Sequence, residues 1–411
     1  MRPMSLYLDD ARIGRFRPQA RRLHQGFVDH FGDSPCAPEL KPFLLEGVQG
    51  IDDVGEKQRD QLGDWRGLRF FKSELVREIG TASEQNVVLA SRSRTLMQLG
   101  MRMLFRNCRR CLTVDLCWPT YKSDLAHCAQ RMGGDIVTVP LRAGLLERQW
   151  DVGEACEYIL AAYVRHRCDG IMLPAVDSTG ILMPLSRIVE ELRRVAGRPF
   201  VLVDAAQALG HIDLGNLSGI ADFLVTGTHK WVGSYFPLGV GIACNPYSQA
   251  WISNCIRSMV ASASVDDGLL RFVVEIENNI DVQRPETTNI GPLFSGCGAL
   301  RNTPNAKDSL PIRKFNADAI SANVESRGWL ALRPTDSLRT GTLLLQSVSP
   351  DVRSLSPEQL AQQFSRRSIQ LTAYQHGIVR MAMPDTQFDS DQLVEIADVL
   401  ESVDRMALLS C

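Results

Sequence analysis

Short apolar runs recur along the middle of the chain, with amphipathic segments between several of them. Runs of five or six residues have the length of strands at 86–90, 111–116, 135–140, 170–174, 200–205, 222–227 and 239–244. Apolar residues return at helical spacing in 94–106, 153–166 and 185–196. Such runs suit strands covered on both faces, and alternation with helices favours parallel pairing. We therefore predict an α/β domain with a mostly parallel sheet of about seven strands flanked by helices.

The two ends of the chain have a different texture. Residues 1–80 are rich in charge and indicate helices and loops. Residues 301–315 are polar and contain two prolines, which is typical of a connection. Beyond them the pattern predicts helices at 316–327, 357–367 and 389–404 and strands at 329–333, 341–346 and 378–382. We predict an N-terminal segment, 1–80, that contributes to a small domain, a large domain, 81–305, and a small C-terminal α+β domain, 306–411.

Composition excludes several classes of protein. The 411 residues carry a formal net charge of −2, which gives no bulk electrostatic reason to bind nucleic acid or an anionic membrane. No apolar run reaches the length of a membrane helix, and the N-terminus has no apolar signal core, so we expect a cytoplasmic protein. The 11 cysteines are scattered, and the pair Cys108 and Cys111 has no partners at zinc spacing, so we expect no metal site.

Two polar residues follow neighbouring predicted strands. Asp204 lies at the end of one apolar run, and Lys230 follows the next run directly after His229. A lone aspartate there would cap a helix, and a lone loop lysine would be a solvated charge. Together they match what pyridoxal phosphate (PLP) requires, namely a lysine amine for the imine and a carboxylate that keeps the pyridine nitrogen protonated. In an open parallel sheet both would meet beyond the carboxyl ends of the strands.

The motif around these two residues resembles a known family. D-A-A-Q at 204–207, then H-K-W at 229–231 and a G-x-G hairpin, is similar to the class V aminotransferase group of fold type I PLP enzymes, which includes cysteine desulfurases and kynureninases. The likeness runs from Y-L-D-D-A-R-I-G near the N-terminus to G-I-V-R-M-A-M-P near the C-terminus. It implies that Asp204 pairs with the pyridine nitrogen, that Gln207 approaches the ring hydroxyl, and that Lys230 forms the internal aldimine and shuttles protons. His229 is then a neighbour of the phosphate or ring.

A polar turn follows the first strand of the predicted sheet. Backbone amides at Ser93 and Arg94, with the side chains of Ser93, Arg94 or Thr95, would face the cofactor phosphate at a helix N-terminus. A simple capping turn is the alternative. The resemblance also implies a hydroxyl three positions before the Schiff-base lysine. A glycine occupies that position here, so Thr226 or Thr228 would have to supply the hydroxyl.

Further residues are expected around the cofactor ring. Trp118 stands where desulfurase-like relatives stack a histidine on PLP, and its π face can do the same. Tyr121 is the fallback, and a core tryptophan is the alternative interpretation. Asp177 takes the position of an asparagine that contacts the ring oxygen in the family, and Ser178 is the other candidate donor.

The resemblance also implies substrate-binding and dimer residues. Arg380 matches an arginine that grips the substrate α-carboxylate with two parallel hydrogen bonds. Tyr374 and His376 precede it and either shape the substrate pocket, supply a second acid or base, or form a turn. Thr288, or alternatively Thr287, matches a loop residue that reaches the phosphate of the neighbouring subunit, which implies a homodimer.

The reaction type stays open at this stage. Residues 301–379 contain no cysteine, so a persulfide mechanism lacks its nucleophile. We expect an aminotransferase-type reaction at Cα of a small amino-acid-type substrate. The alternatives are a PLP-dependent lyase, a β- or γ-elimination or replacement enzyme of specialised metabolism, and, more remotely, a non-catalytic scaffold that kept the fold.

Overall fold

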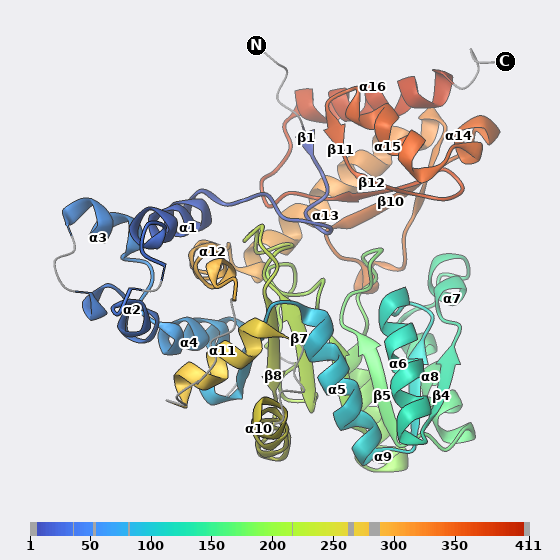
Figure 1. The fold of residues 1–411 in the computed structure, drawn as a ribbon. Helices are drawn as coiled ribbons and strands as arrows, with labels where there is room; N and C mark the ends of the chain where they lie inside the picture. Colours follow the sequence, from blue (N-terminus) through green and yellow to red (C-terminus); the bar gives the residue numbers. More distant parts are fainter. Residues whose placement is uncertain are drawn as a thin grey trace.

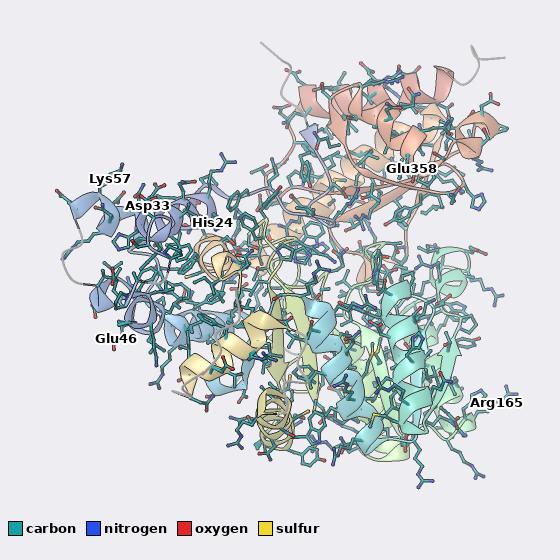
Figure 2. All side chains as sticks on the ribbon, viewed as in Figure 1. His24, Asp33, Glu46, Lys57, Arg165 and Glu358 are labelled. Atoms are coloured by element: carbon teal, nitrogen blue, oxygen red, sulfur yellow. The ribbon has the colours of Figure 1, made fainter. Side chains whose placement is uncertain are left out.

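The computed structural model describes residues 6–35, 37–51, 55–80, 83–215, 217–261, 267–278 and 288–406. Figure 1 shows a large body built around a central sheet and a smaller body beside it, which contains the first strand and the last helix. Charged side chains such as those of Lys57 and Arg165 project from the periphery (Figure 2). Among the described helices, none combines the length and apolar character that crossing a bilayer requires.

The central sheet confirms the predicted α/β core. Its seven strands run in the order β2-β8-β7-β6-β5-β3-β4. Their bounds are Val87–Ala90 (β2), Arg110–Val114 (β3), Asp135–Val139 (β4), Gly170–Pro174 (β5), Phe200–Asp204 (β6), Phe223–Gly227 (β7) and Gly239–Ala243 (β8). Neighbouring pairs from β4 to β7 are parallel, while β8 is antiparallel to β2 and β7. Strands β5 to β8 are buried along their whole length, which explains their continuous apolar runs.

Helices connect and cover these strands. They are Ser93–Asn107 (α5), Pro119–Met132 (α6), Arg142–Leu146 (α7), Val152–Arg165 (α8), Leu185–Ala196 (α9), Pro246–Ala261 (α10) and Gly268–Glu277 (α11). The helix predicted at 153–166 begins at a capping box, in which the Asp151 carboxylate accepts from the Glu154 amide and the Glu154 side chain accepts from the Asp151 amide. Helices α5 and α6 follow β2 and β3, so their N-termini lie at the carboxyl edge of the sheet (Figure 1).

The N-terminal helices surround a buried helix of the large body. They are Pro18–Phe31 (α1), Leu40–Glu46 (α2), Glu56–Leu62 (α3) and Leu68–Ile79 (α4), with short 3-10 turns at Gly47–Gly50 and Glu84–Asn86. Helix α12, Gly291–Leu300, is buried at every position. Leu23 and Phe43 belong to the same apolar core as the central sheet, whereas Leu8 belongs to the core of the small body. The domain boundaries at 80 and 305 stay predictions.

The small body is a four-stranded antiparallel sheet with helices packed on it. The sheet order is β12-β13-β10-β9. Its strands are Trp329–Leu332 (β9), Thr342–Ser347 (β10), Thr372–Tyr374 (β12) and Ile378–Ala382 (β13). Its helices are Ala306–Val324 (α13), Pro350–Ser354 (α14), Pro357–Ser365 (α15) and Ser390–Met406 (α16), with a 3-10 turn at Asp336–Leu338. Strand β1, Leu6–Tyr7, pairs in parallel with β11, Ile369–Gln370.

The predicted connection at 301–315 is wrong from residue 306 onward. Helix α13 starts at Ala306 and continues through Pro311. Its buried face carries Ser309, Arg313 and Asn316 at helical spacing, so the sequence shows no apolar stripe there. The Arg313 guanidinium donates to the Gly210 carbonyl, and the Asn316 amide donates to backbone carbonyls near residue 385. Partners from distant segments therefore satisfy a buried polar face that local pattern cannot recognise.

Candidate active site

A cavity of about 490 Å³ lies where the carboxyl ends of the central strands meet the small body. Pro174 and Asp204, the last residues of β5 and β6, form part of its wall. Many of the predicted site residues line it: Ser93, Trp118, Tyr121, Asp177, Ser178, Asp204, Gln207, His229, Lys230, Tyr374 and Arg380. The fold therefore gathers residues from distant segments at the place expected for an open parallel sheet.

Lys230 and Asp204 face the same cavity. Burial lowers the pKa of the Lys230 amine to about 8, with the nearby Asp204 charge acting in the opposite direction. Burial raises the pKa of the Asp204 carboxyl, opposed by the Ala206 amide, which donates to Asp204 Oδ1 over 3.0 Å. An amine with this pKa is partly unprotonated near neutral pH, so it can attack an aldehyde carbon.

The loop that carries Lys230 is fixed by contacts on both sides. The Gly14 amide donates to the His229 carbonyl over 2.7 Å. A Cβ atom at Gly14 would lie 1.8 Å from the Lys230 carbonyl oxygen, so only glycine fits under this loop. The Thr228 and Ser234 hydroxyls are 2.8 Å apart and close the loop from within. These contacts fix the position of the Lys230 backbone, and the Lys230 side chain lines the cavity.

His229 also borders the cavity. Burial and the neighbouring Lys230 charge lower the pKa of its imidazole to about 4, so the ring is neutral near pH 7. Its buried Nδ1 atom has no hydrogen-bond partner among the described residues. A buried polar atom left unpaired beside a cavity is the arrangement expected where a polar ligand completes the site.

The phosphate end of the predicted site is only partly assembled by this chain. Helix α5 starts at Ser93 with no side-chain cap, which leaves its first amides available to an anion. The Ser93 hydroxyl lies 3.1 Å from the Tyr121 hydroxyl, and both residues line the cavity. Burial raises the pKa of the Tyr121 phenol, so it stays protonated and can donate a hydrogen bond.

Four side chains predicted to contact the phosphate are turned away from the cavity. The Arg94 guanidinium makes two 2.8 Å hydrogen bonds to the Asp124 carboxylate at the protein surface. The Thr95 hydroxyl donates to the Asp267 carboxylate, and the Thr226 hydroxyl donates to the Ala205 carbonyl inside the sheet. The Thr228 hydroxyl is held by Ser234, as described above. The structure does not bring these side chains into the cavity, because closer polar partners hold each of them.

Trp118 and Tyr121 are placed on one side of the cavity by helix α6. The indole of Trp118 is 48% exposed and lines the cavity, so the alternative of a core tryptophan is wrong. Pro119 starts the helix immediately after it, which fixes the direction in which the Trp118 side chain leaves the chain. This position is compatible with stacking on a planar ring.

Asp177 is a fully engaged carboxylate. It accepts hydrogen bonds from the Thr179 amide and hydroxyl and from the Ile181 amide. The Arg142 guanidinium contacts its other oxygen at 3.2 Å. The Asp177 charge is therefore balanced by a cation, Arg142, that the sequence pattern did not reveal. Ser178 also borders the cavity.

The side-chain amide of Gln207, predicted to approach the ring hydroxyl, is bonded to protein groups instead. Its Nε2 donates to the Ala11 carbonyl over 2.8 Å, and its Oε1 accepts from the Trp231 indole over 2.9 Å. Both ends of the amide are used to tie the N-terminal segment to the Lys230 loop. The expected contact with the ring hydroxyl is therefore not supported by the position of this side chain.

Arg380 lies deep in the cavity wall, only 4% exposed. One of its terminal nitrogens donates to Asp9 Oδ1 and to the Thr372 hydroxyl, both at 3.1 Å. The other donates to the Ser178 carbonyl. Its buried Nε has no partner among the described residues, which leaves a hydrogen-bond donor for a ligand.

Tyr374 and His376 separate in the structure. Tyr374 lines the cavity with Arg380 over its ring, and burial raises the pKa of its phenol. His376 is exposed in a turn with φ of 63°, so of the interpretations left open for it, the turn holds. The dipeptide His-Gly between two short strands was the available signal for that turn.

Thr288 is half-buried near the start of α11 and does not line the cavity of its own chain. The alternative, Thr287, lies outside the described residues. The loop's contact with a neighbouring subunit stays a prediction.

Several cavity residues carried no role in the sequence interpretation. Ala11, Arg12 and Thr372 line the cavity, and Asp9 and Arg142 pair with charged residues of its wall. For Asp9, Ala11 and Arg12 the available signal was the motif Y-L-D-D-A-R-I-G, which supported the resemblance although none of its residues was assigned a role.

Comparisons with known proteins agree with this site. Residues 149–249, which contain Asp177, Asp204 and Lys230, match the family model Aminotransferase class-V. A search of curated protein sequences finds no match. This is the family that the motif around Asp204 and Lys230 resembles. The resemblance recognised in the sequence is thus confirmed.

Solved structures confirm fold type I over nearly the whole chain. The cystine C-S lyase C-DES, in complex with its product cysteine persulfide, shares 16% identity at a TM-score of 0.69 and covers 97% of both chains. The cysteine desulfurase CsdA from Escherichia coli shares 14% identity at 0.66, covering 100% of this chain and 96% of that one. Ureidoglycine-glyoxylate aminotransferase from Bacillus subtilis shares 13% at 0.64, covering 98% and 93%. At these identities the likeness shows the fold.

The residues present fit the cofactor. Lys230 offers a reactive amine, and one Asp204 oxygen accepts no hydrogen bond from the described residues. The uncapped N-terminus of α5 and the Trp118 indole supply an anion site and a stacking face. When PLP is bound, it withdraws electrons from Cα of an attached amino acid.

Proposed function

We propose that this enzyme acts at Cα of a small amino acid, with Lys230 as the residue that carries the cofactor and moves the Cα proton. The observation that carries the proposal is the burial of Lys230 and Asp204 in one cavity, with the pKa of the amine lowered to about 8. As a free amine, Lys230 would be a base of suitable strength near neutral pH.

Arg380 is proposed to orient the substrate. Its unpaired Nε and the cavity position of its guanidinium offer hydrogen bonds to an α-carboxylate. A carboxylate held by Arg380 in the cavity wall would fix the orientation of the substrate, and therefore which bond of Cα is broken. His229 is unsuited to act as the base, because its imidazole has a pKa near 4 and is a weak proton acceptor at neutral pH.

An aminotransferase-type reaction remains our primary proposal. The Lys230 amine can both accept and release the Cα proton near neutral pH, so this reaction needs no further acid or base in the cavity. No cysteine lines the cavity among the described residues, so a persulfide-forming cysteine has no candidate there. We further propose that the enzyme is a homodimer, as the sequence resemblance implies, and that it is cytoplasmic, as expected from the composition.

β-Elimination is the second candidate, favoured by Tyr374. Its phenol lines the cavity beside Arg380 and stays protonated, so it can donate a proton to a leaving group on Cβ. The structural likeness to the cystine C-S lyase C-DES points in the same direction.

One experiment separates the two reactions. Purified enzyme is mixed with single amino acids, without any added keto acid, and keto acid and ammonia are measured over time. Transamination predicts one equivalent of keto acid per active site and no ammonia, because the amino group stays on the enzyme. Elimination predicts continuous release of ammonia and keto acid. If Lys230→Ala retained either reaction, the proposal itself would be wrong.

A further inference from the structure

The segment that covers the Lys230 loop is a strap, residues 6–17, tied to both bodies of the molecule. On the small body, the Leu8 amide donates to the Gln370 carbonyl and the Leu8 carbonyl accepts from the Ala382 amide, both at 2.8 Å. On the large body, the Gly14 amide donates to the His229 carbonyl. The strap therefore crosses the cavity wall with its backbone held at both ends.

Arg12 sits in the middle of this strap. Its amide donates to the Asp9 carbonyl over 2.8 Å, which fixes a turn between the two tied ends. Its side chain is exposed and lines the same cavity as Lys230 and Arg380. Its guanidinium makes no hydrogen bond or ion pair with the part of the chain that the structure describes.

The other arginines around the cavity are already neutralised. Arg380 pairs with Asp9, and Arg142 pairs with Asp177. Asp204 is the residue that the sequence resemblance pairs with the pyridine nitrogen. Arg12 is thus a positive charge without a carboxylate partner among the described residues, on the wall of the cavity that Arg380 also lines. Its backbone amide is bonded to the Asp9 carbonyl, while the Asp9 carboxylate pairs with Arg380. A cation fixed in this way raises the local concentration of anions.

We propose that Arg12 determines substrate specificity by binding a second anionic group, at the far end of the substrate side chain. The substrate class is then an amino acid with an acidic side chain, whose α-carboxylate is held by Arg380. This inference rests on the proposed function, because it needs Arg380 as the α-carboxylate site. A guanidinium suits carboxylate, sulfonate and phosphate groups alike through paired hydrogen bonds. The cavity of about 490 Å³ limits the ligand to a small molecule beside the cofactor.

Equilibrium binding to the PLP-loaded enzyme tests this without turnover. Glutarate and succinate are compared with butyrate, which has one carboxylate, by calorimetry and by the change in cofactor absorbance. We expect the dicarboxylates to bind roughly tenfold more tightly than butyrate, and this preference to weaken with added salt. Arg12→Gln should remove the preference, and Arg12→Lys should retain part of it.

Arg15 provides the matched control. It lies on the same strap, is exposed, and does not line the cavity. Arg15→Gln removes an equal charge and should leave the preference for dicarboxylates unchanged. Equal effects of Arg12→Gln and Arg15→Gln, or wild-type enzyme that binds butyrate as tightly as glutarate, would overturn the inference.

Kinetics identify the anionic group. Aspartate, glutamate, cysteate and phosphoserine are compared with asparagine, glutamine and serine. Arg12→Gln should raise KM for the acidic members about tenfold with kcat little changed, since the distal contact is made equally in the ground and transition states. Failure of the proposed function is distinguishable, because the wild-type enzyme would then lack the visible absorbance of lysine-bound cofactor. Normal absorbance with no preference for acidic ligands contradicts the role of Arg12 alone.

Discussion

At the residue scale, the behaviour of the site depends on how burial changes the acidity of Lys230. A solvated lysine amine is fully charged at neutral pH and neither attacks an aldehyde nor accepts a proton. Burial disfavours the ammonium form, and the Asp204 carboxylate limits how far the pKa falls. The Arg380 guanidinium adds a smaller push in the direction of burial.

Capture of PLP by the apoenzyme should therefore depend on pH in a specific way. The reactive form is the neutral amine, so the capture rate should rise with pH and reach half its maximum near pH 8, the pKa of Lys230. Nα-acetyl-lysine amide, which titrates about two units higher, measured in parallel, accounts for ionisation of PLP itself. Asp204→Asn should move the midpoint to lower pH and Arg380→Gln to higher pH. Shifts of the opposite sign would contradict this electrostatic account.

Loss of the amine itself has a larger effect. Lys230→Ala should lower kcat roughly a thousandfold or more, because both the cofactor attachment and the base are removed. After borohydride treatment, mass spectrometry should find the cofactor fixed to the peptide containing Lys230 in wild-type enzyme and nowhere in the variant. A labelled peptide elsewhere in the wild-type chain would contradict the assignment.

The buried pair of Asp9 and Arg380 makes a prediction about stability. Asp9→Ala leaves a buried guanidinium without its carboxylate and should lower the free energy of unfolding by about 3 kcal/mol in urea denaturation. Asp9→Asn should cost less, since its amide oxygen still accepts from Arg380. Asp398 pairs with Arg327 at the surface, so Asp398→Ala is the control and should change stability by less than about 0.5 kcal/mol. Equal losses at both sites would show that Asp9 has no special role.

At the scale of elements, position in the sheet determines how clearly the sequence predicts each segment. Strands β5 to β8 are covered on both faces and read as continuous apolar runs. Helix α13 was hidden, because Ser309, Arg313 and Asn316 on its buried face find their partners in other segments. The pattern of apolar residues along the chain therefore reveals a buried segment only when the buried side chains are apolar.

The strap across the Lys230 loop is the element most sensitive to a single methyl group. Gly14→Ala would place Cβ against the Lys230 carbonyl at 1.8 Å, so the strap must move away from the loop. We expect a lower melting temperature and weaker retention of PLP on dialysis. Gly153, on helix α8, has only side-chain atoms at 3.1 Å or more near its added Cβ. Gly153→Ala should therefore leave both measurements unchanged, and a similar loss in the two variants would contradict this role of the strap.

At the scale of the whole molecule, the cavity is built by both bodies and by the chain's first residues together. Asp204 ends strand β6 of the central sheet, and Lys230 lies in the loop after β7. Tyr374 and Arg380 come from the small sheet, and Arg12 comes from the strap. Relative movement of the two bodies would change the distance between the substrate carboxylate and the amine.

The predicted homodimer belongs to this scale as well. If Thr288 completes the phosphate site of a neighbouring chain, activity and PLP retention should both require the dimer. Gel filtration with light scattering, run across a dilution series, should show activity falling as the dimer dissociates. A monomer that keeps full activity would reject this prediction.

The pattern of residues along the chain was enough to predict the α/β class, the strands in chain order, and the meeting of Lys230 and Asp204 at one site. Apolar runs report burial locally, and a lysine and an aspartate after adjacent strands meet in any open parallel sheet. Which polar side chains reach the cavity could not be predicted in this way, because it depends on packing between distant segments. Arg94, Thr95 and Gln207 are held by partners from other segments, whereas Arg12 is not. A polar side chain forms its hydrogen bonds with the donors or acceptors that packing brings within reach. In a folded chain these partners come from segments far apart in the sequence.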